Sequence, residues 1–335
     1  MVRRSLCRLG LRTVANTVEN HYYLSRCSEF KEDNIIPRGC PTVWQKEGTE
    51  AQAIRSVGAP MSVEQVQHFQ KNGFLVLHNL FTPSETLRLA EEAREVRDRT
   101  VRENPKDERI IMEPNGSAVR SVFAVHKTET VFGKLCREKR ILNVAKVLLG
   151  DDVYLHQSRI NFQAPFVGTG FGWHSDFETW HMEDGMPLPR CLSASVLLTD
   201  NFSYNGPLMV IPGSQEHFIG CVGETPEENA WETSLKNALY FGTPSHSSIQ
   251  KMAVETGAGI RQCTGEAGSV IFFDSNLLHA SSSNLTPFPR ENVFMAFSAV
   301  SNAPLDHVFT AKGRPEHLAC RDPQWAGVPL APTRV

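Results

Sequence analysis

Apolar positions recur with helical spacing in the first half of the chain. The motifs SVEQ at residues 62–65 and TPSE at residues 82–85 have the capping-box form, in which Ser or Thr precedes Gln or Glu by three positions, and each predicts a helix start. Gly73 predicts the end of the first helix, and the apolar run at 74–77 predicts a buried strand. A third periodic stretch, residues 130–149, predicts one more helix. The second helix has an apolar stripe made of Leu87, Leu89, Ala90, Ala93 and Val96.

After Gly150 the pattern changes to short apolar or alternating runs separated by Gly, Pro, Asn and Asp. These runs predict strands at residues 153–162, 192–198, 208–211, 269–273 and 293–300. Helices followed by many short strands predict a mainly β protein with flanking helices, built as a barrel or a sandwich. The polar, weakly helical segment 218–265 interrupts the strands, so we expect it to be either a lid over the barrel or a plain surface excursion.

Composition excludes several classes of protein. The chain has 335 residues with 34 basic and 37 acidic side chains, and no run of like charges, so nothing in it indicates a nucleic-acid partner. Its apolar runs are far shorter than the roughly 18 residues that a membrane span needs. The eight cysteines include no CxxC pair, which removes support for a zinc ribbon or a redox motif and favours a reduced intracellular compartment.

The N-terminal segment differs from the rest in charge. Residues 1–18 contain no acidic side chain, and the first one is Glu19. This composition is typical of a transit peptide, which would send the protein to the mitochondrial matrix. The alternative is a poorly ordered basic tail on a cytoplasmic protein. The basic residues are Arg3, Arg4, Arg8 and Arg12.

The candidate chemistry lies in the motif WHSDFETWH at residues 173–181. On a strand, residues two apart point the same way, so His174 and Asp176 are predicted to share one face. His279, which follows the predicted strand 269–273, supplies a third donor. Two histidines and one carboxylate form the facial triad that suits non-haem Fe(II) and leaves positions open for oxygen and a chelating cosubstrate. The alternative is a surface or core histidine beside a capping aspartate.

Two residues near His279 favour the interpretation of these three side chains as a non-haem Fe(II) site. Arg290 lies eleven residues further on, at the start of the next predicted strand, where its guanidinium could grip the far carboxylate of a 2-oxo acid. Ser281 adds a hydroxyl donor two residues after His279.

The segment HQSRINFQ at residues 156–163 places four polar side chains on one face of a strand. Polar groups in line on a buried strand need partners, which are the substrate and cosubstrate if this face lines the metal cavity. The alternative is an edge strand that faces solvent. The four side chains are Gln157, Arg159, Asn161 and Gln163.

Aromatic side chains flank the motif. Phe171, Trp173 and Trp180 would exclude water from the site and could stack on a cationic or delocalised ligand, unless they are simply core residues. Other nearby histidines are interpreted as supporting or surface residues rather than ligands: His156, His181 and His217.

Longer segments resemble a known family. HQSRIN, WHSDFETWH followed by MEDGMP, NGPLMVIPGS at 205–214 and TPFPR at 286–290 are similar to the ectoine hydroxylases of the phytanoyl-CoA dioxygenase superfamily. IIPRGCPTVW at 35–44 and KGRPEHLA at 312–319 also match, so the resemblance covers about residues 20 to 321.

The resemblance implies a double-stranded β-helix core, a jelly roll of the cupin-like kind found in Fe(II)/2-oxoglutarate oxygenases. It implies Fe(II), 2-oxoglutarate and O2 as requirements, and hydroxylation of ectoine to 5-hydroxyectoine with release of succinate and CO2. It also implies a homodimer. We accordingly expect a single oxygenase domain at 19–321, with a helical part at about 60–150, a jelly-roll core at about 151–310, and a C-terminal tail at 322–335.

Site residues carry over by position. The resemblance assigns the iron ligands to His174, Asp176 and His279. It places Asn161, Ser281 and Arg290 at the 2-oxoglutarate site, where Phe171 is also expected. It places Gln157, Trp180 and Arg314 at the ectoine pocket, where Arg159 is also expected. Gln157 and Arg314 suit the carboxylate of ectoine, and the face of Trp180 suits its delocalised amidinium.

Three positions depart from the family pattern. Gln163 stands where a lysine is common, Gly172 where an aromatic residue is common, and Gln215 where histidine completes PGSH. We expect these changes to affect affinity and turnover rather than reaction type. Two other functions stay open at this point: a related oxygenase acting on another small amino or imino acid, and a barrel that binds a metal or solute without turnover.

Overall fold

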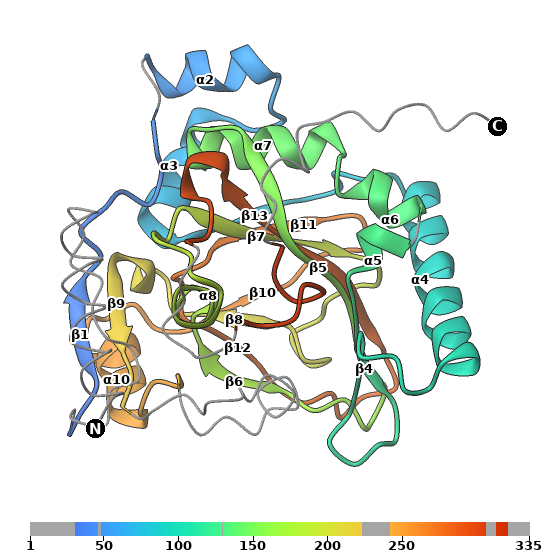
Figure 1. The fold of residues 1–335 in the computed structure, drawn as a ribbon. Coiled ribbons are helices and arrows are strands. Elements are labelled where there is room, and N and C mark those ends of the chain that lie inside the picture. The colour runs from blue at the N-terminus through green and yellow to red at the C-terminus, as the bar shows by residue number, and fades with distance from the viewer. Residues whose placement is uncertain (1–30, 46–47, 129, 223–241, 306–312, 321–335) are drawn as a thin grey trace.

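Two antiparallel sheets form the centre of the molecule (Figure 1). The computed structural model describes residues 31–45, 48–128, 130–222, 242–305 and 313–320. The larger sheet has the order β2 (Phe74–Leu77), β11 (Val270–Asp274), β7 (Cys191–Leu197), β13 (Arg290–Ala299), β5 (Val153–Gln163), β4 (Val119–Phe123), β3 (Ile110–Met112). The smaller sheet has the order β10 (Arg261–Cys263), β8 (Leu208–Val210), β12 (His279–Ser281), β6 (Phe171–His174). A separate pair joins β1 (Asn34–Pro37) to β9 (His217–Gly220).

The two sheets face each other across an apolar cluster. Phe273 and Phe294 of the larger sheet pack in one cluster with Leu208 and Val210 of the smaller sheet. This arrangement is the predicted jelly-roll core, and it leaves a space between the sheets in which a site can form.

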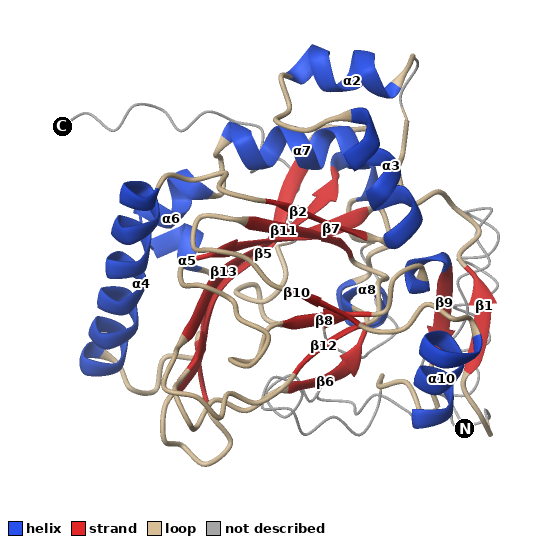
Figure 2. Cartoon of the chain, turned by 180° about the vertical axis from the view of Figure 1, so that it is seen from behind, coloured by secondary structure: helices blue, strands red, loops and turns tan. Residues whose placement is uncertain are grey.

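Helices cover the outer face of the larger sheet, on the side away from the smaller one (Figures 1 and 2). Ser62 and Thr82 each close a capping box with the residue three positions later, which confirms the predicted helix starts. The helices on that face are α3 (Val63–Asn72), α4 (Pro83–Glu103), α5 (Val125–Thr128), α6 (Thr130–Leu135) and α7 (Lys139–Leu149). Helix α2 (Glu50–Val57) packs against α3 and α7, whereas α8 (Asp176–Asp184) contacts β9 and α10 (His246–Gln250) lies beside the β1–β9 pair.

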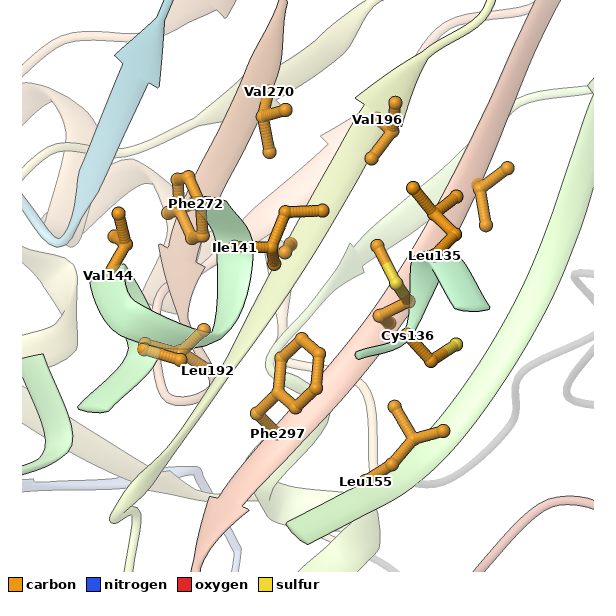
Figure 3. Packing of buried hydrophobic residues seen from close by; sticks show 14 of the residues in the cluster. Leu135, Cys136, Ile141, Val144, Leu155, Leu192, Val196, Val270, Phe272 and Phe297 are labelled. Atoms are coloured by element: carbon orange, nitrogen blue, oxygen red, sulfur yellow. The ribbon is translucent and has the colours of Figure 1, made fainter. Parts of the chain in front are cut away.

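The main core lies between these helices and the larger sheet. In Figure 3, Ile141 and Val144 of α7 pack toward side chains of the sheet, among them Phe272, Leu192 and Phe297. Along β13, alternate residues such as Val293 and Met295 belong to this core. The residues between them therefore point to the other face of the sheet, toward the space between the sheets.

Two details of the helix predictions are wrong. The stretch 130–149 is not one helix, because Glu138 caps a new helix by accepting a hydrogen bond from the backbone N–H of Arg140. Leu87, assigned to the apolar stripe of α4, is 57% exposed, whereas Leu89 and Ala93 are buried.

All six predicted strands, the run at 74–77 included, are present, within three residues at each end. The short strands β1, β3, β4 and β12 were not predicted. The segment 218–265 was expected to be weakly helical. Its described part also contains strands, because β9 and β10 lie in it together with α10 and a π-helix at Lys251–Glu255. Residues 223–241 lie outside the described residues, and a closing motion of this segment stays a prediction.

The predicted extension at 1–18 and the tail at 322–335 also lie outside the described residues, so the transit peptide stays a prediction. Among the helices that the structure describes, none combines the length and the hydropathy required for crossing a membrane.

Candidate active site

Three side chains with metal-ligating atoms meet at one end of the smaller sheet. His174 is the last residue of β6 and pairs directly with His279, the first residue of β12. The Nε2 atoms of His174 and His279 lie 3.8 Å and 3.9 Å from Oδ1 of Asp176. One ligand atom from each residue lies within 4.8 Å of the others, so the structure brings the predicted triad together.

The prediction that His174 and Asp176 share one face of a strand is wrong. Strand β6 ends at His174, and Asp176 is the first residue of α8 rather than a strand residue. Ser175 has extended backbone angles and caps α8, its hydroxyl accepting a hydrogen bond from the backbone N–H of Glu178. The sequence carried this signal, because Ser175 and Glu178 have capping-box spacing.

Backbone carbonyls fix the orientation of both imidazoles. The Nδ1 atom of His174 lies 2.7 Å from the carbonyl oxygen of Gly172, and Nδ1 of His279 lies 2.9 Å from that of Leu277. A carbonyl oxygen only accepts, so each Nδ1 carries the proton and each Nε2 presents a lone pair toward Asp176. Support of this kind for a ligating histidine is typical of metal sites.

The protonation states also suit a cation. Burial, followed by the nearby His174, lowers the pKa of His279 to about 4, so this imidazole is neutral near pH 7. Burial raises the pKa of the Asp176 carboxyl, but His279, His174, Arg159 and the Ser193 hydroxyl together hold that pKa below its ordinary value. Neutral imidazoles and an ionised carboxylate are the forms that bind a divalent metal, so the donor set fits Fe(II).

A single pocket joins the triad to the other predicted residues. Its empty space is about 1020 Å³ when the open mouth is included. The predicted residues in its lining are Gln157, Arg159, Asn161, Phe171, His174, Asp176, Trp180, His279, Ser281, Arg290 and Arg314. Within the described chain, Trp173, His156, His181 and His217 do not contribute to this lining.

Arg290 defines one end of the pocket. Its guanidinium is buried and donates from Nη2 to Oε1 of Gln163 at 3.2 Å, while its Nε has no hydrogen-bond partner within the described part of the chain. Burial, and then the guanidinium of Arg120, lowers the pKa of Arg290 to about 10, so it stays charged at neutral pH. A buried cation with an unused donor fits the distal carboxylate of 2-oxoglutarate.

Asn161 and Ser281 lie in the same lining and are held by neighbours. The side-chain oxygen of Asn161 accepts a hydrogen bond from the Ser121 hydroxyl at 2.8 Å. The hydroxyl of Ser281 accepts one from the backbone N–H of Phe171 at 3.2 Å. These contacts restrict both side chains before any ligand enters.

The opposite end contains Trp180, which is buried. The ring of His156 meets it edge-on at 5.1 Å, and His156 in turn lies 3.0 Å from a carboxylate oxygen of Asp184. Asp184 also accepts from Nε of Arg314 at 2.9 Å. The network therefore fixes Trp180 and Arg314 in the wall of the pocket.

Gln157 and Arg314, which were expected to contact the carboxylate of ectoine, already have hydrogen-bond partners within the protein. The amide nitrogen of Gln157 donates to the carbonyl of Leu318 at 2.7 Å, and its oxygen accepts from Arg159. Arg314 pairs with Asp184 as described above. Arg159 is the second cation at this end, and its guanidinium lies 4.9 Å from the ring centre of Phe294.

Sequence reasoning missed several lining residues. Phe294 could have been found, because it is four residues after Arg290 on one strand and so shares its face. Ser121 and Phe123 come from β4, which carries no recognisable motif, and Glu183 follows Trp180 by less than one helical turn.

Comparisons with known proteins agree with this geometry. The profile of the family described as Phytanoyl-CoA dioxygenase (PhyH) matches residues 69–292. The chain is 46% identical over 309 residues to an ectoine dioxygenase of Bordetella bronchiseptica, a match covering 92% of this chain and 95% of the relative.

Solved structures give the same result. The structure of EctD from S. alaskensis with 2-oxoglutarate and 5-hydroxyectoine matches with a TM-score of 0.75 and 37% identity, over 90% of this chain and 95% of that one. The structure of the same protein with bound Fe matches with a TM-score of 0.74 and 37% identity, over 89% and 95%. The chain therefore belongs to the phytanoyl-CoA dioxygenase family and, within it, to the ectoine dioxygenases, as its motifs indicated.

Proposed function

We propose that this protein hydroxylates ectoine to 5-hydroxyectoine, consuming one 2-oxoglutarate and one O2 and releasing succinate and CO2. The observation that carries the proposal is one pocket that holds the histidine–aspartate triad together with a buried arginine whose Nε has no hydrogen-bond partner among the described residues. The likeness to ectoine dioxygenases along most of the chain supports the choice of substrate. Residues 19–321 act in this proposal as one oxygenase unit.

His174, Asp176 and His279 are the proposed iron ligands. Bound Fe(II) supplies the redox chemistry that couples O2 to the two organic substrates. The chain contributes a fixed ligand geometry, since β6, β12 and the start of α8 each hold one ligand in place. Asp176 also accepts a hydrogen bond from the hydroxyl of Ser193 at 3.3 Å, which orients the carboxylate.

Arg290, Asn161, Ser281 and Phe171 form the proposed 2-oxoglutarate end. Arg290 binds the distal carboxylate, because a buried guanidinium both neutralises that charge and fixes its direction. Its hydrogen bond to Gln163 restricts the orientation of the guanidinium. In this chain Gln163 thus supports Arg290, at the position where a lysine is common in the family.

Trp180, Gln157, Arg159 and Arg314 form the proposed ectoine end. The face of Trp180 suits the delocalised cation of ectoine, and the two guanidiniums supply positive charge for its carboxylate. Arg314 is paired with the carboxylate of Asp184, whereas Arg159 donates to the neutral amide of Gln157, so we assign the main carboxylate contact to Arg159. These residues bind and orient the substrate, and the surrounding aromatic rings exclude water.

A substrate panel separates this proposal from a related oxygenase. With iron and 2-oxoglutarate present, succinate formation is expected to rise at least about tenfold with ectoine and much less with proline or other small amino acids. All of these compounds carry a carboxylate and a cation, but only the cation of ectoine is a delocalised amidinium that suits the face of Trp180. Stimulation by another compound exceeding that by ectoine would contradict the substrate assignment. A barrel without turnover would give no succinate with any compound.

We also propose a homodimer, as the family resemblance implies, and assign its contact to a surface that we call the aromatic rim. Phe202 stacks on Tyr204 at 5.0 Å, and Tyr204 lies 6.1 Å from Phe288. Neighbouring Leu285 is 78% exposed. Clustered exposed apolar side chains are typical of interaction surfaces.

Replacing both Leu285 and Phe288 with glutamate is expected to convert the dimer to a monomer, because paired charges would be buried in the contact. Light scattering after gel filtration measures this directly. A monomeric unmodified protein would contradict the dimer, and a double variant that stays dimeric would contradict the choice of surface.

A further inference from the structure

Arg120 is a buried cation next to the proposed cosubstrate end that no step above uses. It lies on β4, and its side chain is 2% exposed. Its guanidinium forms an ion pair with Glu113 at 3.1 Å, and the Glu113 side chain is 0% exposed. A buried ion pair is costly unless its geometry is fixed by further hydrogen bonds, so its contacts indicate what it holds.

Those contacts all lead to the segment that enters β6. Arg120 donates from Nη1 to the carbonyl and hydroxyl oxygens of Thr169, at 2.7 Å and 2.6 Å, and from Nη2 to the carbonyl of Gly170 at 2.8 Å. Glu113 accepts from the hydroxyl of Thr169 at 2.6 Å. Strand β4 belongs to the larger sheet and β6 to the edge of the smaller one, so this cluster joins the two sheets.

The guanidinium also lies on the ring of Phe171. Its central carbon is 3.6 Å from the ring centre, which is the contact distance of a stacked pair. The same ring lines the pocket, and the backbone N–H of Phe171 donates to the hydroxyl of Ser281. A shift of Phe171 would therefore disturb two residues of the proposed 2-oxoglutarate end together.

The backbone leaves this segment little freedom on its other side. A Cβ atom on Gly170 would lie 2.2 Å from the carbonyl oxygen of Ser281, so the backbone segments at Gly170 and Ser281 are already in close contact. Arg120 packs against the segment 169–171 from one side, and β12 packs against it from the other. Its charge also acts on Arg290, whose pKa it lowers in addition to burial, so both cations lie at the same end of the pocket.

We propose that Arg120 is a positioning residue for 2-oxoglutarate: held by Glu113 and Thr169, it fixes the ring of Phe171 and the entrance of β6 against the cosubstrate. The inference rests on the proposed function, because it names what that end of the pocket binds. Arg120 does not line the pocket and acts through Phe171.

The test is calorimetric titration of anaerobic, Fe(II)-loaded protein with 2-oxoglutarate, a binding measurement that needs no turnover. Arg120→Lys, which keeps the charge but loses the planar face, and Arg120→Met are each expected to weaken binding by about 10- to 100-fold. Iron affinity is expected to stay within about twofold. Arg140→Lys is the matched control, because Arg140 also stacks on a phenylalanine, Phe81 at 4.3 Å, and pairs with Glu85.

Coupling to Phe171 separates positioning from a general loss of stability. Phe171→Leu alone is expected to weaken 2-oxoglutarate binding, and the double variant with Arg120→Lys is expected to be hardly weaker than either single one. Fully additive losses would overturn the inference, as would an Arg120→Lys protein that melts normally and binds 2-oxoglutarate as the unmodified protein does. If the unmodified iron-loaded protein itself did not bind 2-oxoglutarate, the proposed function would fail and the inference with it.

Discussion

Replacing Asp176 with asparagine is expected to abolish turnover and to weaken Fe(II) binding by well over 100-fold. Loss of a residue that only orients a metal ligand costs about 10- to 100-fold, so loss of the one anionic ligand should cost more. Asparagine keeps the size of the side chain and removes only its charge. The carboxylate is also the group that both imidazole Nε2 atoms face, at 3.8 Å and 3.9 Å.

The measurement is an anaerobic Fe(II) titration followed by a turnover assay. Asp152→Asn is the control, because Asp152 carries an exposed carboxylate that pairs with Lys146 at 2.9 Å and does not line the pocket. His174→Ala and His279→Ala are expected to behave like Asp176→Asn. An Asp176→Asn protein with full activity would remove the triad from the mechanism.

Replacing Arg290 with methionine is expected to weaken 2-oxoglutarate binding by at least about 30-fold while iron binding is retained. Removing one partner of a buried charge pair costs about 2–5 kcal/mol, which corresponds to roughly 30- to 5000-fold in affinity. Arg290→Lys is expected to lose less, because it keeps the charge and loses only the forked geometry.

Calorimetric titration of the iron-loaded variants with 2-oxoglutarate measures these losses. Arg102→Met is the control, since Arg102 is 64% exposed and lies on α4. An unchanged affinity in Arg290→Met would show that the distal carboxylate binds elsewhere, and Arg159 would be the next candidate.

The sequence predicted best what depends on neighbouring residues. The helix starts at Ser62 and Thr82 follow from capping boxes of four residues, and the polar face of β5 follows from a period of two. The structure brings the three residues of the predicted triad together, although Asp176 reaches the other two from a helix start rather than from a strand. The residue types were sufficient to identify these three residues, but they did not predict the backbone conformation at Asp176.

Features that depend on contacts between distant segments could not be predicted. Arg120 and Thr169 are 49 residues apart, and Gln163 and Arg290 are 127 apart. Only the register of β5 with β13, in which Gln163 pairs with Arg290, places the second pair together. The sequence shows that Gln163 departs from the family pattern, but only the fold shows that its amide oxygen accepts from the arginine.

The most direct measurement supplies O2 to anaerobic, iron-loaded protein with 2-oxoglutarate and ectoine, and quantifies succinate and 5-hydroxyectoine in the same sample. We predict equal amounts of the two products, and little succinate when ectoine is left out. Succinate without 5-hydroxyectoine would contradict ectoine as the substrate, and the absence of both products would contradict the assignment of this pocket as an oxygenase site.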